Sequence, residues 1–293
     1  RFDTAKNFFQ RLNDSKSKLD TWSGELYLEL HRGTLTTHGL VKRQNRKLEW
    51  KLRLVEMIWS CLPLENYPLK ELNQMWKKLL INQFHDIIPG SSINLVYQNT
   101  HKEYEQIQED CDKLIAISGK QLFKEDINSF VLVNTLSYSW QGAVSIPDSF
   151  HGFSLLDENN QSLDLQSNGE STFASVKLNP LSFTTIKKGK KTKLRNNKND
   201  DLILENKLIR YEFNKDGQLI SAYDKVLDKE FLLEAGNILS LYEDRPNNWD
   251  AWDVDFFYRE ALIETATISR AESLSTGKVF DQLKLSFTIG KSN

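Results

Sequence analysis

The first 125 residues of the chain place apolar and polar side chains with the period of a helix. Residues 4–19 predict an amphipathic helix, and residues from about 36 to 62 predict a longer one with apolar spacings of three and four. The apolar face of the longer helix comprises Leu48, Leu52, Val55, Trp59 and Leu62. Pro63 and Pro68 indicate that this helix ends before them, because proline lacks the backbone donor that continues a helix.

Two further helices are predicted downstream. Residues 69–83 predict a helix whose inward side chains are Leu72, Trp76, Leu79 and Leu80. The next helix is expected to begin with Ser91 or Ser92 as its N-cap, since a serine hydroxyl accepts a bond from a first-turn amide. Its stripe comprises Ile93, Val96, Thr100, Tyr104, Ile107, Cys111 and Leu114. Three consecutive helices with short links predict an antiparallel bundle.

Near residue 126 the period changes to two, which is typical of strands. The alternating runs are residues 130–137, 142–147, 201–206, 208–213, 218–224 and 283–289. Residues 214–217 (NKDG) are a hairpin signal, and many short strands with turn signals predict a β-sandwich. The basic run 187–200 predicts a solvated loop between strands. One isolated short strand is predicted earlier, at residues 24–30.

Composition and charge narrow the classes of function. Hydrophobic residues make up 39% of the 293 residues, which supports packed cores rather than disorder. The formal net charge of −2 gives no electrostatic case for binding nucleic acid or an anionic membrane. No apolar run is long enough to span a bilayer. Seven Trp suit a sugar-handling protein, because indole faces stack on pyranose rings, but a core role explains any single one more simply.

Two cysteines and the two ends of the chain add weaker constraints. Cys61 and Cys111 lie at apolar helical positions, which predicts two buried thiols in a reducing compartment, with a disulfide as the alternative. No signal peptide is visible. The chain opens on Arg1 without Met and ends just past a strand pattern at Asn293, so both ends are expected to be cuts within a longer protein.

The first candidate for chemistry is the run NQFHDIIPGSS at residues 82–92. His85 and Asp86 lie between two predicted helices, where an imidazole can ligate zinc and the adjacent carboxylate can bind sugar hydroxyls or orient a ligand. Pro89 and Gly90 suit a turn with a close backbone approach. On spacing alone, a capping or surface pair explains His85 and Asp86 better.

The second candidate is GELYLELHRGTLTTHG at residues 24–39. Glu25, Glu29 and His31 share one face of the predicted strand, because alternate residues of a strand point the same way. At the edge of a cleft, such a strand end could supply a general acid. A solvent-facing strand edge with ordinary charges is the simpler interpretation of this run alone.

The third candidate is YEDRPNNWDAWDVDFFY at residues 242–258, which is rich in Asp and Trp. A Trp ring can stack on a sugar while a carboxylate binds vicinal hydroxyls, so Trp252 and Asp253 are candidate substrate contacts. A structured β-loop with buried indoles explains the same composition equally well.

Together these runs resemble glycoside hydrolase family 38, the α-mannosidases, and most of all its cytosolic and bacterial branch. The phrases that carry the resemblance are GELYLELHRGTLTTHG followed by Lys42-Arg43-x-Asn45-Arg46, then WKKLLINQFHDIIPGSS at 76–92, then EDRPNNWDAWD at 243–253. They occur in the family's order and the match covers essentially the whole chain. Three long phrases in register outweigh the simpler interpretation of any one of them.

The resemblance implies a multidomain α+β fold that is truncated at both ends. Residues 1–33 would be the C-terminal edge of the catalytic α/β domain, and residues 34–125 the central antiparallel three-helix bundle. Residues 126–293 would be the N-terminal part of an antiparallel β-sandwich of the galactose-mutarotase-like type. The resemblance also implies a cytoplasmic protein, and it leaves a homo-oligomer of the parent open.

The resemblance further implies retaining, zinc-dependent hydrolysis of terminal α-mannosyl residues of oligosaccharides or glycans. His85 matches a zinc ligand and Asp86 the carboxylate that holds substrate hydroxyls. The family's other zinc ligands, a His-x-Asp and the nucleophilic Asp, have no counterpart here, since this sequence contains no His-x-Asp. Glu29 and His31 are candidates for the catalytic acid, without a choice between them.

The sequence is therefore compatible with two functions. In the first, the chain supplies one zinc ligand and sugar contacts to an α-mannosidase, with zinc bound in the intact parent and absent or incomplete in these residues alone. The 293-residue chain by itself is then expected to be inactive. In the second, it is a non-catalytic scaffold or carbohydrate-binding fragment, as the missing nucleophile and ligands would allow.

Overall fold

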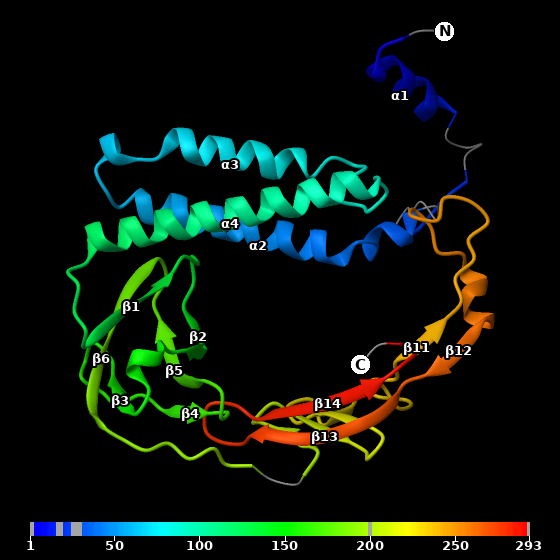
Figure 1. The fold of residues 1–293 in the computed structure, drawn as a ribbon. Coiled ribbons are helices and arrows are strands. Elements are labelled where there is room, and N and C mark those ends of the chain that lie inside the picture. The colour runs from blue at the N-terminus through cyan, green and yellow to red at the C-terminus, as the bar shows by residue number, and fades with distance from the viewer. Residues whose placement is uncertain (1–2, 16–19, 25–30, 199–200, 292–293) are drawn as a thin grey trace.

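The chain was analysed as a computed structural model that describes residues 3–15, 20–24, 31–198 and 201–291. Within these ranges the α-helices are α1 (Ala5–Asp14), α2 (Gly39–Trp59), α3 (Leu69–Ile81) and α4 (Asn94–Leu122). The fold is thus mixed α and β, with the helices in the first part of the chain and antiparallel sheets after them (Figure 1). Residues 25–30 of the strand predicted at 24–30 lie outside the described residues.

The helices α2, α3 and α4 lie side by side and share one hydrophobic core (Figure 1). Its buried side chains include four of the predicted face of α2, namely Leu48, Leu52, Val55 and Trp59. Polar contacts reinforce the packing: the Trp59 indole donates to the carbonyl of Leu114 at 3.1 Å, and the Trp76 indole donates to Glu56 at 2.8 Å. Each fully buried apolar side chain contributes about 1.5–3 kcal/mol relative to exposure.

Several helix predictions need correction. The predicted helix at 69–83 ends at Ile81, and Leu80 is 55% exposed, because Met75 takes the inward position on that face. Neither Ser91 nor Ser92 caps α4, whose N-cap is Ile93. The buried stripe near its start contains Tyr97 in place of Val96 and Ile93.

The cysteine prediction is right for one residue and wrong for the other. Both thiols are free, so the disulfide alternative is also wrong. Cys111 is buried in the helical core, whereas Cys61 is exposed because α2 ends two residues before it, at Trp59.

The strands of the described part form five antiparallel sheets of two to four strands. The first two sheets, in the orders β1-β6-β3 and β2-β5-β4, share a second core that includes Ile146, Phe150, Leu155, Val176 and Ile186. Their strands are β1 (Ser129–Asn134), β2 (Trp140–Ser145), β3 (Phe153–Leu156), β4 (Leu165–Ser167), β5 (Thr172–Leu178) and β6 (Ser182–Lys191). Residues 187–191 of the expected basic loop are therefore strand, and the loop follows them.

The remaining sheets have the orders β10-β9-β8-β7, β11-β12 and β13-β14. Their strands are β7 (Ile203–Glu205), β8 (Ile209–Phe213), β9 (Leu219–Asp224), β10 (Lys229–Glu230), β11 (Ser240–Tyr242), β12 (Leu262–Thr265), β13 (Thr267–Ser275) and β14 (Gln282–Thr288). The predicted hairpin is confirmed: β8 pairs with β9 antiparallel, and Gly217 has φ +74° in the turn. The β-sandwich and the domain division stay predictions.

Side-chain contacts join these parts. Arg53 of α2 donates to the carbonyl of Thr135 after β1, at 2.9 Å. The amide of Gln166 in β4 donates to Ser275 and to the carbonyl of Phe280, near the other end of the β region (residues 129–288). The β region thus leaves the end of α4, runs beneath the helices and returns to the start of α2 (Figure 1).

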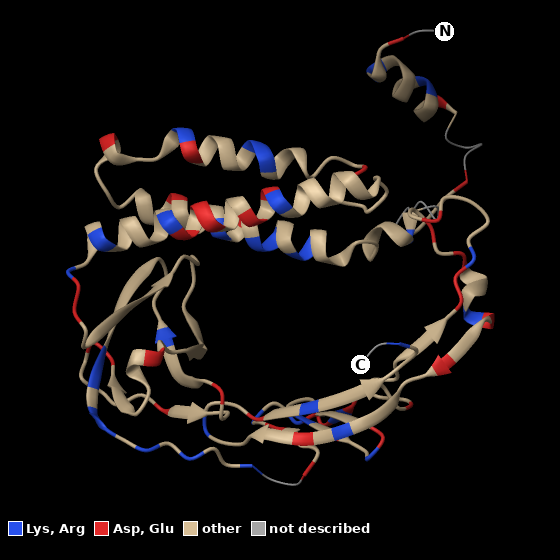
Figure 2. Ribbon diagram, in the orientation of Figure 1, with Lys and Arg blue, Asp and Glu red and all other residues tan. Residues whose placement is uncertain are grey.

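Charges of both signs are mixed along the helices, whereas the segment after β6 is mostly basic. Figure 2 shows Lys and Arg interspersed with Asp and Glu along the three helices, and basic residues along the segment after β6. In the part of the chain that the structure describes, no helix combines the length and the apolar character needed to cross a bilayer.

Candidate functional site

Three loops that are far apart in sequence meet at one end of the helices. They are residues 31–38, which precede α2, residues 82–93, which join α3 to α4, and residues 249–255, which lie between β11 and β12. We call them the first, second and third loops. They coincide with the three runs of candidate chemistry, and Figure 1 shows the β region returning to the start of α2.

The first and third loops touch through their backbones. The amide of Gly33 donates to the carbonyl of Trp252 at 2.9 Å. A Cβ on Gly33 would lie 3.0 Å from the carbonyl carbon of Trp252 and 3.1 Å from the backbone of Asp253. Glycine suits this approach, because a Cβ here would require the backbone of the third loop to give by a few tenths of an ångström.

An ion pair closes the same contact. Arg32 donates to Asp253 at 3.2 Å, and Asp253 is only 5% exposed. The Arg32 guanidinium holds the pKa of the Asp253 carboxyl below its usual value, and a bond from the amide of Val254 adds to this shift. The carboxylate of Asp253 is thus engaged within the junction of the two loops.

The first and second loops are joined at Gly90, where sequence reasoning expected a close backbone approach. Gly90 has φ +103°, and a Cβ there would lie 2.6 Å from Cγ2 of Thr37. The ammonium of Lys42 bridges the same two loops: it donates to the carbonyls of Thr37, Ile88 and Pro89. Three loops are therefore held in one junction by backbone contacts, the Arg32–Asp253 ion pair and Lys42.

His85 and Asp86 project from this junction. The His85 side chain is 71% exposed and that of Asp86 45%, and His85 Nε2 lies 3.3 Å from Asp86 Oδ2. The Phe84 ring packs on the imidazole with centroids 4.2 Å apart. The two polar groups predicted to act together are thus adjacent and accessible.

One hydroxyl group holds the Asp86 carboxylate, and another holds the backbone of Ile87 beside it. Ser91 Oγ donates to Asp86 Oδ1 at 3.2 Å, and the Tyr97 hydroxyl donates to the carbonyl of Ile87 at 3.2 Å. The Ser92 amide donates to that hydroxyl, and His38 stacks on the Tyr97 ring at 3.9 Å. Burial raises the pKa of the Tyr97 phenol.

A buried polar network anchors the start of the second loop. Asn82 is 2% exposed; its amide donates to Glu103 at 2.7 Å, and its oxygen accepts from Thr100 at 2.7 Å. The next residue, Gln83, donates to Asn45 at 3.2 Å and to Glu49 at 2.8 Å. Leaving such buried groups unpaired costs about 1–3 kcal/mol each, so the network fixes where the loop leaves α3.

Of the remaining predicted site residues, two meet and one lies outside the described part. His31 and Trp252 pack edge to face with centroids 5.3 Å apart, both half-buried. Glu29 lies outside the described residues. The catalytic roles of Glu29 and His31, and the sugar contacts of Trp252 and Asp253, stay predictions.

The described residues offer only part of a metal site. No group of three or more His, Cys, Asp and Glu side chains within them is arranged to hold a metal ion. His85 supplies one exposed nitrogen with a carboxylate oxygen beside it, which fits one corner of a zinc site. A complete zinc site of three or four ligands would need further donors.

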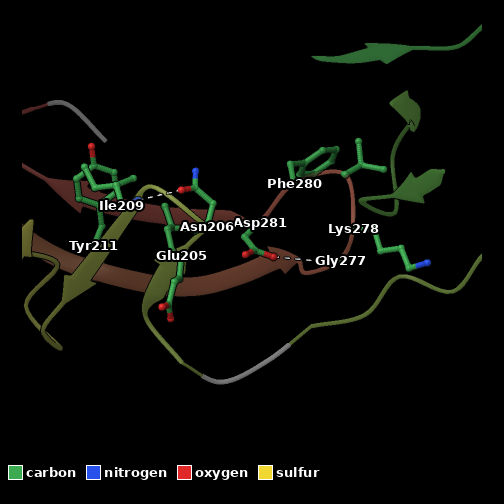
Figure 3. Close-up of a pocket in the computed structure, with 10 residues that line it drawn as sticks. Glu205, Asn206, Ile209, Tyr211, Gly277, Lys278, Phe280 and Asp281 are labelled. Atoms are coloured by element: carbon green, nitrogen blue, oxygen red, sulfur yellow. Dashed lines mark hydrogen bonds between the residues drawn. The ribbon is translucent and has the colours of Figure 1, made fainter. Parts of the chain in front are cut away.

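A separate hollow of about 370 Å³ lies in the β region, between β7–β8 and the turn joining β13 to β14 (Figure 3). None of the predicted site residues lines it. Two of its polar side chains are bonded to backbone amides: Asn206 accepts from the amides of Leu208 and Ile209, and Asp281 accepts from the amide of Gly277. The hollow lies where these two parts of the β region meet.

Sequence reasoning missed the residues that build the junction. Arg32, Lys42 and Tyr97 make its principal side-chain contacts across the loops. Lys42 stood in one of the phrases that carried the family resemblance, and Tyr97 lies on the buried face of α4 one position from the predicted Val96. Their bonding partners lie in other loops, so no local pattern identified them.

Comparison with family models gives two matches. Residues 29–122 match the alpha mannosidase middle domain, and residues 204–293 match the glycosyl hydrolases family 38 C-terminal domain. The first match contains the first and second loops, and the second contains the third loop. The order of the two matches is the one expected from the three phrases.

Curated relatives and solved structures agree with these matches. Alpha-mannosidase G of Dictyostelium discoideum is 28% identical over 88% of this chain, and alpha-mannosidase 2C1 of Homo sapiens is 29% identical over 94%. The chain spans 28% and 26% of those proteins.

The fold is shared with solved structures. An alpha-mannosidase from Enterococcus faecalis V583 has a TM-score of 0.59 at 16% identity, over 91% of this chain and 37% of that one. A second family 38 structure from Enterococcus faecalis has a TM-score of 0.57 at 18% identity, with the same coverage.

Proposed function

Because this chain belongs to glycosyl hydrolase family 38, we propose that it forms part of an α-mannosidase and supplies one corner of the active site. The substrate would be a glycan or oligosaccharide with terminal α-mannosyl residues, and the enzyme would act in the cytoplasm. The three helices would form the family's antiparallel bundle. The sheets would begin its β-sandwich.

The observation that carries this proposal is the convergence of the three loops. The three phrases that resemble the family lie up to about two hundred residues apart, yet they meet in one junction through Gly33, Gly90 and Lys42. His85 and Asp86 leave that junction exposed. Convergence of distant polar loops on one accessible point is the usual geometry of an active site.

In this proposal His85 ligates zinc through a ring nitrogen, and Asp86 accepts hydrogen bonds from mannose hydroxyls. Zinc, when bound, would supply a positive charge that holds the 2- and 3-hydroxyls of the sugar. Ser91 keeps Asp86 oriented, since its hydroxyl bonds the inner carboxylate oxygen and leaves the outer one beside His85. Glu29 and His31 are the candidates for protonating the leaving oxygen in a retaining reaction.

The test compares His85→Ala with His101→Ala in the intact α-mannosidase that contains this chain. His101 is a matched control, because it lies on α4 and bonds Gln44 at 2.9 Å rather than facing the junction. Zinc content and hydrolysis of an aryl α-mannoside are measured for both. We expect His85→Ala to lose zinc and at least about 100-fold in kcat/KM, and His101→Ala to keep both.

Retention of zinc and activity by His85→Ala would refute this assignment. A complementary measurement uses the 293-residue chain alone, which we expect to show negligible turnover and no tight zinc. Robust hydrolysis by that chain would contradict the idea that it holds only one corner of the site.

A second function, a carbohydrate-binding scaffold without catalysis, is favoured by one observation. The described residues contain no group of three or more potential metal ligands. Calorimetric titration of the 293-residue chain with mannose oligosaccharides separates the two ideas. A scaffold would bind them with micromolar affinity by itself, whereas one corner of an active site would not.

A further inference from the structure

Lys42 makes an unusual set of contacts for a lysine near the surface. It lies in the first turn of α2, and its ammonium donates to the carbonyl of Ile88 at 2.8 Å, of Pro89 at 3.1 Å and of Thr37. An ammonium has three donors, so the three carbonyls use all of them. Two of these carbonyls lie within four residues of His85.

No carboxylate within the described residues forms an ion pair with Lys42, although most charged side chains of α2 have such partners or face water. The side chain is half-buried, and this burial lowers the pKa of its amine. Hydrogen bonds to a charged donor are roughly twice as strong as neutral ones, so three carbonyls compensate for the loss of water. This is the chemistry of a backbone clamp rather than of a surface charge.

The second loop needs such a clamp. Between Asn82 and the start of α4 at Asn94, its backbone bonds are turns such as Ile88 N–H to Phe84 O and Gly90 N–H to Ile87 O. The buried network at Asn82 fixes the start of the loop, and Tyr97 holds the middle from the α4 side. From α2, Asn45 and Glu49 bond Gln83 at the start of the loop, and Lys42 bonds the backbone at Ile88 and Pro89.

A second observation supports the clamp independently. Gly90 lets the second loop lie against Thr37, since any Cβ would overlap Cγ2, Cβ and the carbonyl oxygen of that residue. The Thr37 carbonyl is also a Lys42 acceptor. The close approach at Gly90 and the bridge from Lys42 therefore bring the same pair of loops together.

We propose that Lys42 is a positioning residue that ties the 85–90 backbone to the first loop and thereby sets the direction in which His85 and Asp86 project. The expected effect of Lys42 on zinc and substrate binding rests on the proposed function. The anchoring itself depends only on the observed contacts. The Arg32–Asp253 ion pair bonds the first loop to the third, so Lys42 links the second loop to a loop that is itself held in place.

The anchoring is tested by amide hydrogen exchange on the 293-residue chain. Lys42→Met keeps the apolar stem and removes the donors, Lys42→Arg keeps a cation and several donors, and Lys47→Met is the control on an exposed position of the same helix. We expect Lys42→Met to speed exchange of the Ile88 and Gly90 amides by about 10- to 100-fold. Exchange in β8 and β9 stays unchanged, and Lys42→Arg recovers most of the protection.

The effect of Lys42 on zinc binding and catalysis is tested in the intact α-mannosidase that contains the chain. Lys42→Met should weaken zinc binding and kcat/KM for an aryl α-mannoside by about 10- to 100-fold, as loss of an orienting contact does elsewhere. Lys47→Met should change neither. His85→Ala is assayed beside them, so that the assignment of His85 is judged separately.

The outcomes distinguish the anchoring of the loop, the positioning role of Lys42 and the proposed function. Unchanged loop exchange in Lys42→Met, or faster exchange throughout the chain, overturns the anchoring. A loosened loop with normal zinc affinity and kcat/KM, while His85→Ala loses both, overturns the positioning role and leaves the proposed function standing. If His85→Ala also keeps zinc and activity, the proposed function fails, and the exchange data alone decide whether Lys42 holds the loop.

Discussion

Replacing Gly90 by alanine tests the junction at its tightest point. The backbone there has φ +103°, which an L-residue adopts only at a cost of about 1–3 kcal/mol. The new Cβ would also lie 2.6 Å from Thr37 Cγ2 and 2.9 Å from the Thr37 carbonyl oxygen, well inside contact distance. Relieving such overpacking by moving backbone costs about 1–3 kcal/mol more.

Gly152 provides a control for the cost of placing alanine at a positive φ. Gly152 has φ +81°, and no atom lies within 4 Å of its ideal Cβ, so Gly152→Ala carries the conformational cost without the overlap. We therefore expect Gly90→Ala to lower the unfolding free energy by about 2–6 kcal/mol and Gly152→Ala by about 1–3 kcal/mol. Gly39→Ala, at a helical position with open space, should not destabilise the chain.

The assay is urea unfolding followed by far-ultraviolet circular dichroism, with amide exchange to locate the change. A double variant, Thr37→Ser with Gly90→Ala, removes the methyl group that the new Cβ meets first and keeps the Thr37 hydroxyl function. It should recover part of the lost stability. Equal losses for Gly90→Ala and Gly152→Ala, or no recovery in the double variant, would refute the claim that close approach to Thr37 requires glycine.

Three further predictions concern the contacts that hold the parts together. Asp253→Asn should lower the unfolding free energy at neutral pH, because it removes the ion pair with Arg32. Arg32 lowers the folded-state pKa of Asp253, so the stabilisation by this carboxylate is fully present above its ordinary pKa of 3.8. The difference in unfolding free energy between Asp253→Asn and the parent chain should therefore shrink as pH falls below 3.8. Thiol reagents should label Cys61 in the folded chain but Cys111 only after unfolding, since burial raises the pKa of Cys111 to about 11; equal labelling rates would contradict this. Gln166→Ala should cost about 1–3 kcal/mol in urea unfolding and loosen the β13–β14 turn in amide exchange, because it removes the buried amide that bonds that turn; unchanged protection there would count against it.

The sequence alone determined the family, the three long helices and one hairpin. Helical spacing located the core of α2, with Leu48, Leu52, Val55 and Trp59 all buried, because a period of 3.6 leaves one face to pack. The turn at residues 214–217 located a hairpin, since its glycine supports a positive φ. Local patterns were less reliable at helix ends, where Leu80 and Cys61 proved exposed.

Only the tertiary structure decided which residues build the candidate site. The sequence marked His85, Asp86, Trp252 and Asp253 as chemistry in separate runs, but it could not show that Asp253 is engaged with Arg32 inside a junction.

Lys42 stood in a phrase of the family resemblance, but no local pattern showed that its ammonium binds carbonyls of both the first and the second loop. The physical reason is that periodicity records which face of an element is buried, whereas a bond between residues far apart in sequence depends on where the chain returns in space.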